Sequence, residues 1–265
     1  MKKKNNKEVK RIKSGRLVFA ALITVFLIAG IIAAYNLITT ELDNNAAQSE
    51  YAELRQWAPV TSSPPAADNN PESSDTAADP DSTIESPSPV NSLVLSLFNP
   101  DYIGWIRING TNIDYPIVQG TDNIKYLTTT FMGERNPSGA IFMDSECSYG
   151  FTGFSLLHGH NMRNGSMFAE LHNFRDAEFL AQYSEITIYL PDDEALTFKI
   201  FDVIVTDIYD AVFDLPIKGQ EAFTNYFGDY DLVGHYIRDR SGILVLSTCT
   251  DGHRNERLLV LAVRQ

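Results

Sequence analysis

The sequence predicts a mostly antiparallel β-barrel with short peripheral helices, preceded by one transmembrane helix and a disordered stalk. Three observations support this architecture: a long apolar run near the N-terminus, a Pro-rich acidic segment after it, and a series of short β-type runs over residues 91–265. The chain has 265 residues, of which 44% are hydrophobic, so it can build a sizeable core. Its length allows one or two domains.

The N-terminal region has the pattern of a membrane anchor. Residues 1–16 carry a net charge of +7, and residues 17–34 are apolar apart from Thr24 and Gly30. Continued to residue 38, a helix would span roughly 33 Å, enough to cross the hydrocarbon core. The run is longer than a signal-peptide core, and no small-residue cleavage site follows it. We therefore expect a cytoplasmic tail over residues 1–16, an uncleaved span over residues 17–38 and an exported remainder.

Residues 39–90 are predicted to form an extracellular stalk rich in Pro, Ser and Asp. Seven of the 12 prolines lie between Pro59 and Pro89, and Arg55 is the only base within residues 41–90. Such a composition cannot bury enough apolar surface to offset its chain entropy. We expect a flexible segment with a short helix over residues 51–57, and little contribution of residues 1–90 to the core.

Residues 91–265 are predicted to form one β-rich domain. Short runs rich in Ile, Val, Leu and Phe lie at residues 104–108, 113–118, 140–143, 154–157, 186–190, 196–205, 243–247 and 258–263. Helical spacing follows two N-cap residues, Ser166 and Asp176, and a third helix is expected over residues 220–237. The strands dominate without β-α alternation, which favours a mostly antiparallel barrel with helices outside.

Charge and cysteine content exclude several classes of protein. The whole chain carries −13, so residues 17–265 carry −20, which makes the exported part a poor nucleic-acid binder. The two cysteines, Cys147 and Cys249, are too few for a disulfide scaffold or a four-cysteine zinc site.

Cys249 ends a predicted buried strand and is a candidate nucleophile, although a cysteine in that place can also be a small buried hydrophobe. Residues 250–256 are polar and predict a loop, which places the thiol at an exposed rim. Arg257 then opens the next strand. A strand–loop–strand pair would bring Arg257 beside Cys249, where a guanidinium favours the thiolate and can hydrogen-bond an oxyanion.

A thiolate enzyme also needs an acid for the leaving group, and histidines are the candidates. His158 and His160 follow a predicted strand, strand alternation puts both on one face, and Gly159 between them permits a turn. His253 is closer to Cys249 in sequence but lies on a loop. We therefore prefer His160, because a strand end is the more rigid position.

The other histidine patterns have structural interpretations. His172 and His235 fit solvated surface positions. His158 and His160 could supply half of a metal site, but zinc needs three or four ligands. The sequence therefore predicts no metal.

These motifs resemble those of a sortase, a membrane-anchored cysteine transpeptidase of Gram-positive cell surfaces. The resemblance rests on two segments. One is residues 246–249, followed by Arg257 at the head of a strand, and the other is residues 159–162 upstream. The details resemble class B in five further blocks: residues 101–106, 113–123, 126–127, 139–144 and 159–168. The resemblance covers about residues 91–265. It implies a sortase-type closed β-barrel, with residues 220–237 as the helix between the sixth and seventh strands.

The resemblance also implies roles for the candidate residues. Cys249 would be the nucleophile, His160 the general acid and Arg257 the contact to substrate and oxyanion. Substrate would also meet Ser247, Thr248 and, more weakly, Asp251. No cofactor is implied.

Three positions stand apart from the family pattern. Arg254 is the nearest competitor of Arg257, but it lies in the middle of a loop. His158 stands where class B more often has an aromatic residue, which would alter the shape of the groove. Cys147 matches no catalytic position.

The implied activity is cleavage of the C-terminal sorting signal of surface proteins after Thr, through a thioacyl intermediate. The implied acceptor is an amine of a peptidoglycan precursor, so the enzyme would be a thiol peptidase and transpeptidase for cell-wall anchoring. The cell membrane would hold it by a single pass, with the N-terminus cytoplasmic and the catalytic domain extracellular. A pilin-polymerising sortase is the alternative within the family.

Other classes account for fewer of these features. Papain-like proteases place Cys before His, whereas His160 precedes Cys249 by 89 residues. L,D-transpeptidases have a nearly adjacent His and Cys, which this sequence lacks. A non-enzymatic membrane-anchored adhesin explains the anchor, the stalk and the β-rich domain, but not the combination of Cys249, His160 and Arg257.

Overall fold

The computed structural model describes residues 2–58, 91–151, 153–192, 194–228, 230, 242–250 and 255–265. The chain divides into two compact units, Met1–Ala46 and Ala47–Gln265. Residues 59–90, most of the expected stalk, lie outside the described residues.

The first unit consists of helix α1 (Lys2–Leu54) up to residue 46. In the described part of the chain, one helical stretch is long and apolar enough to cross a membrane, Leu22–Trp57, with a mean hydropathy of 2.2. Its large side chains are exposed, with Phe26 at 76% and Ile31 at 69%. Because a helix satisfies its own backbone hydrogen bonds, such an exposed apolar surface suits a lipid surrounding. The helix is consistent with the anchor expected over residues 17–38.

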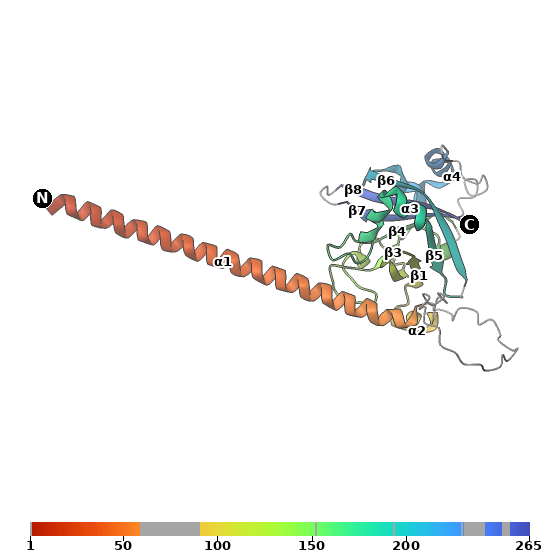
Figure 1. Ribbon diagram of the computed structural model, residues 1–265, viewed down its shortest axis with the longest axis horizontal. Coiled ribbons are helices and arrows are strands. Elements are labelled where there is room, and N and C mark those ends of the chain that lie inside the picture. Colours follow the sequence, from red (N-terminus) through yellow and green to blue (C-terminus); the bar gives the residue numbers. More distant parts are fainter. Residues whose placement is uncertain are drawn as a thin grey trace, which may run out of the picture. The chain divides into compact units, whose positions relative to one another are not determined.

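The second unit is a barrel of β-strands (Figure 1). It is closed, and its eight strands follow the order β1-β2-β3-β4-β7-β8-β6-β5. The strands are β1 (Tyr102–Ile108), β2 (Asp114–Val118), β3 (Ile141–Met143), β4 (Ser155–His158), β5 (Glu185–Tyr189), β6 (Ala195–Asp207), β7 (Ile243–Cys249) and β8 (Glu256–Arg264). Each coincides with one of the runs predicted from the sequence. The pairs β2–β3 and β4–β7 are parallel and the other neighbours antiparallel, which confirms the mostly antiparallel barrel.

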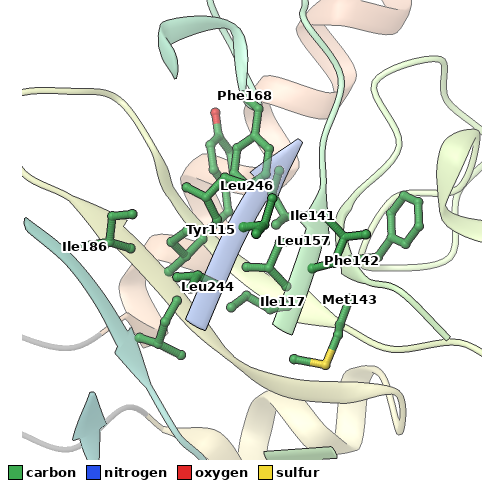
Figure 2. Packing of buried hydrophobic residues seen from close by; sticks show 14 of the residues in the cluster. Tyr115, Ile117, Ile141, Phe142, Met143, Leu157, Phe168, Ile186, Leu244 and Leu246 are labelled. Carbon is green, nitrogen blue, oxygen red and sulfur yellow. The ribbon is translucent and has the colours of Figure 1, made fainter. Parts of the chain in front are cut away.

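Apolar side chains from neighbouring strands fill the barrel. Figure 2 shows Ile117, Ile141, Leu157 and Leu246, from β2, β3, β4 and β7, in one cluster with Phe168. All five are fully buried. An eight-stranded barrel is just wide enough for side chains to fill its interior. This packing holds β4 and β7, the strands that end at the candidate site, in the middle of the core.

Short helices lie around the barrel (Figure 1). They are α2 (Ser92–Phe98), α3 (Ala177–Gln182), α4 (Leu215–Phe227) and the 3-10 helices η1 (Arg55–Trp57), η2 (Lys125–Leu127), η3 (Tyr149–Phe151), η4 (Ala169–Arg175) and η5 (Ala211–Asp214).

The two predicted N-caps have different outcomes. Asp176 caps α3 as predicted, since its Oδ1 accepts hydrogen bonds from the amides of Glu178 and Phe179 at 3.0 and 2.9 Å. The prediction for Ser166 was wrong. Its hydroxyl donates to Asn164 Oδ1 at 2.7 Å, and the helix that follows is the 3-10 helix η4, which begins only at Ala169.

Helix α4 connects β6 to β7, as the family resemblance implied. It begins at Leu215 rather than at residue 220, with a proline in its first turn, where the missing N–H costs nothing. Phe223 and Phe227 are fully buried and pack on Phe154, with ring centroids 6.0 and 6.3 Å away. Residues 231–241, which include the end of the expected helix, lie outside the described residues.

The last turns of α1 belong to the barrel unit, which begins at Ala47 where the sequence led us to expect a stalk. Ala47, Tyr51 and Leu54 are at most 4% exposed. The Tyr51 hydroxyl donates to the Gly139 carbonyl at 2.7 Å, and its ring meets Tyr115 edge-on at 5.2 Å. Residues 47–58 therefore contribute to the core, contrary to our expectation for residues 1–90.

We predict that removing residues 1–46 leaves the stability of the barrel unit unchanged, whereas removing residues 1–58 lowers it. In the shorter truncation, Tyr51→Phe should cost about 1 kcal/mol through the lost hydrogen bond, and Tyr51→Ala about 3–5 kcal/mol through the lost packing. Urea unfolding of the truncated chains measures these differences. Glu53→Ala, at an exposed position of the same helix, is the control, and equal stability of both truncations would contradict the prediction.

Candidate active site

The parallel strands β4 and β7 end side by side; Cys249 is the last residue of β7, and His160 lies two residues past the end of β4. Within the ladder, His158 pairs with Ser247. Beyond it, the Gly159 amide donates to the Ser247 carbonyl at 3.1 Å, and the Thr248 hydroxyl donates to the Gly159 carbonyl at 2.8 Å. His160 and Cys249 are the next residues of the two segments. The register of one strand pair therefore brings a histidine and a cysteine to the same rim.

The strand that follows brings an arginine to this rim. Strands β7 and β8 are antiparallel, and Cys249 pairs with Arg257 in their register. The expected position of Arg257 beside Cys249 is therefore confirmed, and β8 begins one residue earlier, at Glu256. Residues 251–254, most of the expected loop, lie outside the described residues. Arg257 Nη1 donates to the Glu256 carbonyl at 2.9 Å.

The three residues line one cavity of about 510 Å³. Its other walls come from β3, β4, β7 and the segments beside them: Asn123, Leu127, Phe142, Asp144, His158, Gly159, Ile208, Phe213, Ser247 and Thr248. Ser247 and Thr248, expected as substrate contacts, lie in this wall and are 3% and 2% exposed. The remaining expected contact, Asp251, and the competitors His253 and Arg254 lie outside the described residues, as does His235.

His160 is held by a backbone carbonyl. Its Nε2 lies 2.7 Å from the Leu127 carbonyl oxygen, which can only accept, so Nε2 carries the hydrogen and Nδ1 is the basic nitrogen of the neutral ring. Gly159 before it serves close packing and has no unusual backbone conformation. A Cβ at this position would lie 2.6 Å from side-chain atoms of Ile141 and Phe168. The expected turn at Gly159 is therefore replaced by a tight approach of β4 to its neighbours.

His158 is paired with a carboxylate at the wall of the cavity. Its Nε2 lies 3.2 Å from Asp144 Oδ2, and its ring packs between Phe142 and Phe213. Burial opposes ionisation of Asp144, but hydrogen bonds from His158, the Glu146 amide and Asn123 outweigh it. The pKa of the Asp144 carboxyl is therefore lowered from its ordinary value.

The structure also shows the surroundings of His172, which the sequence assigned to the surface, and of Cys147, for which the sequence indicated no role. We interpreted His172 as a solvated surface residue, and this was wrong: it is half-buried and its Nε2 lies 3.0 Å from the Cys249 carbonyl. Its buried neighbours in η4, Leu171 and Phe174, were the available signal. Cys147 is buried, and its carbonyl accepts from the Gln119 side chain at 2.9 Å, outside the cavity lining.

Comparison with known proteins identifies the family. A model of the sortase domain matches residues 106–265, more than half of the chain. The chain belongs to the sortase family. It is 34% identical to sortase B of Clostridium perfringens, with a TM-score of 0.58 over 65% of this chain and 98% of that structure. It is 31% identical to a Streptococcus pyogenes class B sortase involved in pilus biogenesis, with a TM-score of 0.54 over 65% of this chain and 96% of that one.

The curated relatives are also class B sortases. This sortase is 30% identical to sortase B of Listeria monocytogenes in an alignment 169 positions long that covers 58% of this chain. It spans 65% of the length of that relative, slightly less than two thirds. The resemblance to class B noted in the sequence is therefore confirmed, as is the sortase-type barrel with a helix between β6 and β7.

The Asp144–His158 pair generates a prediction on stability. The lowered pKa of Asp144 means that its ionised form stabilises the fold. That contribution is complete above the ordinary pKa of 3.8 and is lost as the pH falls through the lower folded-state pKa. Asp144→Asn should therefore destabilise the protein by about 1–2 kcal/mol near neutral pH. Urea unfolding at several pH values should show this deficit shrinking below pH ~4, and a deficit independent of pH would contradict the assignment.

Proposed function

We propose that this sortase is a class B cysteine transpeptidase that anchors surface proteins to the cell wall. The observation that carries the proposal is the single cavity that Cys249, His160 and Arg257 line. Its substrate would be the C-terminal sorting signal of a surface protein, and its acceptor an amine of a peptidoglycan precursor.

In the first half of the reaction, Cys249 acts as the nucleophile. Its thiolate sulfur bonds to the carbonyl carbon of a Thr in the sorting signal, and the resulting oxyanion receives hydrogen bonds from the Arg257 guanidinium. The C–N bond to the following residue then breaks. The departing amine takes a proton from the His160 imidazolium, which leaves a thioacyl enzyme and a neutral His160.

In the second half, an incoming amine resolves the thioacyl enzyme. Neutral His160 takes a proton from this amine as its nitrogen bonds to the thioester carbonyl. The C–S bond breaks and the Cys249 thiolate is restored. The surface protein is then joined through a new amide bond, and His160 is again protonated for the next cycle.

Recognition of the sorting signal would use the walls of the same cavity. Ser247 and Thr248 lie beside Cys249, and Asp251 follows it in sequence as a weaker candidate. The His158–Asp144 pair adds a polar, hydrogen-bonded group between two aromatic rings. We propose that this pair determines which side chains of a sorting signal fit, because it stands where class B more often has an aromatic residue.

The anchor fits a cell-surface enzyme. We propose a single membrane pass over residues 17–38, with residues 1–16 in the cytoplasm and the barrel outside. The net charge of +7 on residues 1–16 supports this orientation, since positively charged segments remain on the cytoplasmic side.

Pilus assembly is the second candidate function. It is favoured by the 31% identity to the Streptococcus pyogenes enzyme involved in pilus biogenesis. The two functions differ in the acceptor, which is a pilin side-chain amine in one case and a peptidoglycan amine in the other. Incubating the enzyme with a sorting-signal peptide and each acceptor in turn would distinguish them by the mass of the product.

Cys249→Ala should abolish turnover of a sorting-signal peptide, and Arg257→Lys should lower kcat/KM by about 10²–10³-fold, because an ammonium group cannot reproduce the guanidinium fork. Mass spectrometry of the wild-type enzyme without an acceptor should find the acyl group on Cys249. Arg254→Ala is the matched control for the arginine. Full activity of Arg257→Ala would indicate that Arg254 stabilises the oxyanion instead. If neither cysteine is acylated, the result favours the non-enzymatic adhesin.

His160→Ala should lower kcat by about 10²–10⁴-fold, because it removes the proton donor for the leaving amine. His253→Ala should retain most of the activity, and EDTA should have no effect. The peptide assay with each variant measures this. Loss of activity in His253→Ala, with activity retained in His160→Ala, would show that His253 is the general acid. Inhibition by EDTA that zinc reverses would support a metal site at His158 and His160.

The proposed orientation predicts that protease added to intact, wall-stripped cells releases a fragment that contains the barrel. The fragment should start after the membrane span, because the barrel lies outside the cell. Immunoblotting with an antibody against residues 91–265 detects it. Protection of those residues in intact cells, with digestion only after lysis, would show the opposite orientation.

A further inference from the structure

On the side of β4, the Cys249 carbonyl faces a position where the barrel supplies no strand partner, although Cys249 pairs with Arg257 of β8 on the other side. Carbonyl groups alternate in direction along a strand, so the Cys249 carbonyl points to the same side as that of Ser247. The Ser247 carbonyl accepts from Gly159, on the side of β4. Strand β4 ends at His158, before it could reach Cys249. The Cys249 carbonyl therefore needs a hydrogen-bond donor from another element.

His172 provides this donor. The 3-10 helix η4 places its Nε2 at 3.0 Å from the Cys249 carbonyl oxygen. Since a carbonyl oxygen only accepts, Nε2 carries the hydrogen. This commits Nε2 to the backbone of the nucleophile.

The same ring also contacts the segment that carries His160. The Asn161 side-chain nitrogen Nδ2 lies 3.3 Å from His172 Nε2. Because Nε2 carries the hydrogen that goes to the Cys249 carbonyl, it has no lone pair for this N–H, and the two groups are in contact without a second hydrogen bond. Asn161 follows His160 directly and pairs with Met167, and the Phe168 amide closes this hairpin on the His160 carbonyl at 2.9 Å. His172 therefore lies between the hairpin of His160 and the carbonyl of Cys249.

We propose that His172 is a positioning residue that fixes the Cys249 peptide group and couples it to the His160 hairpin. This inference rests on the proposed function. Without the imidazole, the peptide group after Cys249 could change its orientation through the flanking φ and ψ angles, and the thiolate would lose its alignment with the scissile carbonyl. Misplacement by about 1 Å can cost 10²-fold in rate, so the effect belongs to kcat rather than to substrate binding.

Two substitutions separate the hydrogen bond from the packing of the ring. His172→Phe keeps a ring without the donor, and His172→Gln places an amide N–H near the position of Nε2. We expect His172→Phe to lower kcat by about 10- to 100-fold with little change in KM, and His172→Gln to recover most of that loss. If the Phe variant fails to fold, His172→Met, which is apolar, flexible and without a donor, replaces it.

Glu170→Gln is the matched control in the same helix. Glu170 accepts hydrogen bonds from the side chain of Asn112, at 2.6 Å, and from its amide, so its substitution loosens η4 without touching Cys249. We expect a lower Tm with unchanged kcat. For each variant, the loss of kcat is compared with the fall in Tm. If the ratio of the two is the same for Glu170→Gln and His172→Phe, His172 has only a structural role. A Gln variant as inactive as the Phe variant at equal Tm would overturn the proposal.

Long-range ¹H–¹⁵N spectra of the histidine rings test the contact independently of activity. His172, assigned by the signal missing from His172→Gln, should show the tautomer with hydrogen on Nε2. The opposite tautomer would overturn the proposal even in an active enzyme. If the wild-type protein does not turn over any sorting-signal peptide while the Nε2–H tautomer is present, the proposed function fails and the contact at Cys249 stands.

Discussion

The hydrogen bonds that join β4 to β7 are the contact on which the rest of the site depends. Parallel pairing keeps the ends of both strands at the same rim, so a residue just past one end is a neighbour of a residue just past the other. Two bonds beyond the regular ladder, at Gly159 and Thr248, extend this alignment to His160 and Cys249. A side chain at Gly159 would push β4 away from Ile141 and Phe168 and break the alignment. The buried core therefore sets the spacing of the reactive groups.

Much of the fold could be predicted from the sequence, because each strand is a short apolar run bounded by turn residues. The neighbourhood of Cys249 and Arg257 was also predictable, since adjacent antiparallel strands place their facing ends together. The pairing of β4 with β7 was not, because the ends of these strands are 91 residues apart in the sequence and no local pattern encodes their register. For that contact the family resemblance supplied what the periodicity could not.

Two structural features could not be predicted from the sequence, because the residues around them suggested a different interpretation. Ala47, Tyr51, Leu54 and Ala58 are spaced as one helical face, but they lie next to a Pro-rich acidic stretch whose composition dominated the interpretation. His172 lies in a short 3-10 helix between the buried Leu171 and the exposed Asn173, so the local pattern does not decide which way its ring faces. Its role depends on a backbone carbonyl, and backbone groups leave no trace in a sequence.

Closure of the barrel restricts how any polypeptide can dock to this unit. Many peptide-binding domains extend a sheet by pairing the ligand with an edge strand, and the main-chain bonds then provide affinity for almost any sequence. In the described barrel every strand already has two neighbours. A bound peptide must therefore be held by side chains and loops around the cavity, which makes recognition depend on residue identity rather than on extended conformation. A protein built this way can meet many chains with exposed backbone and bind few of them.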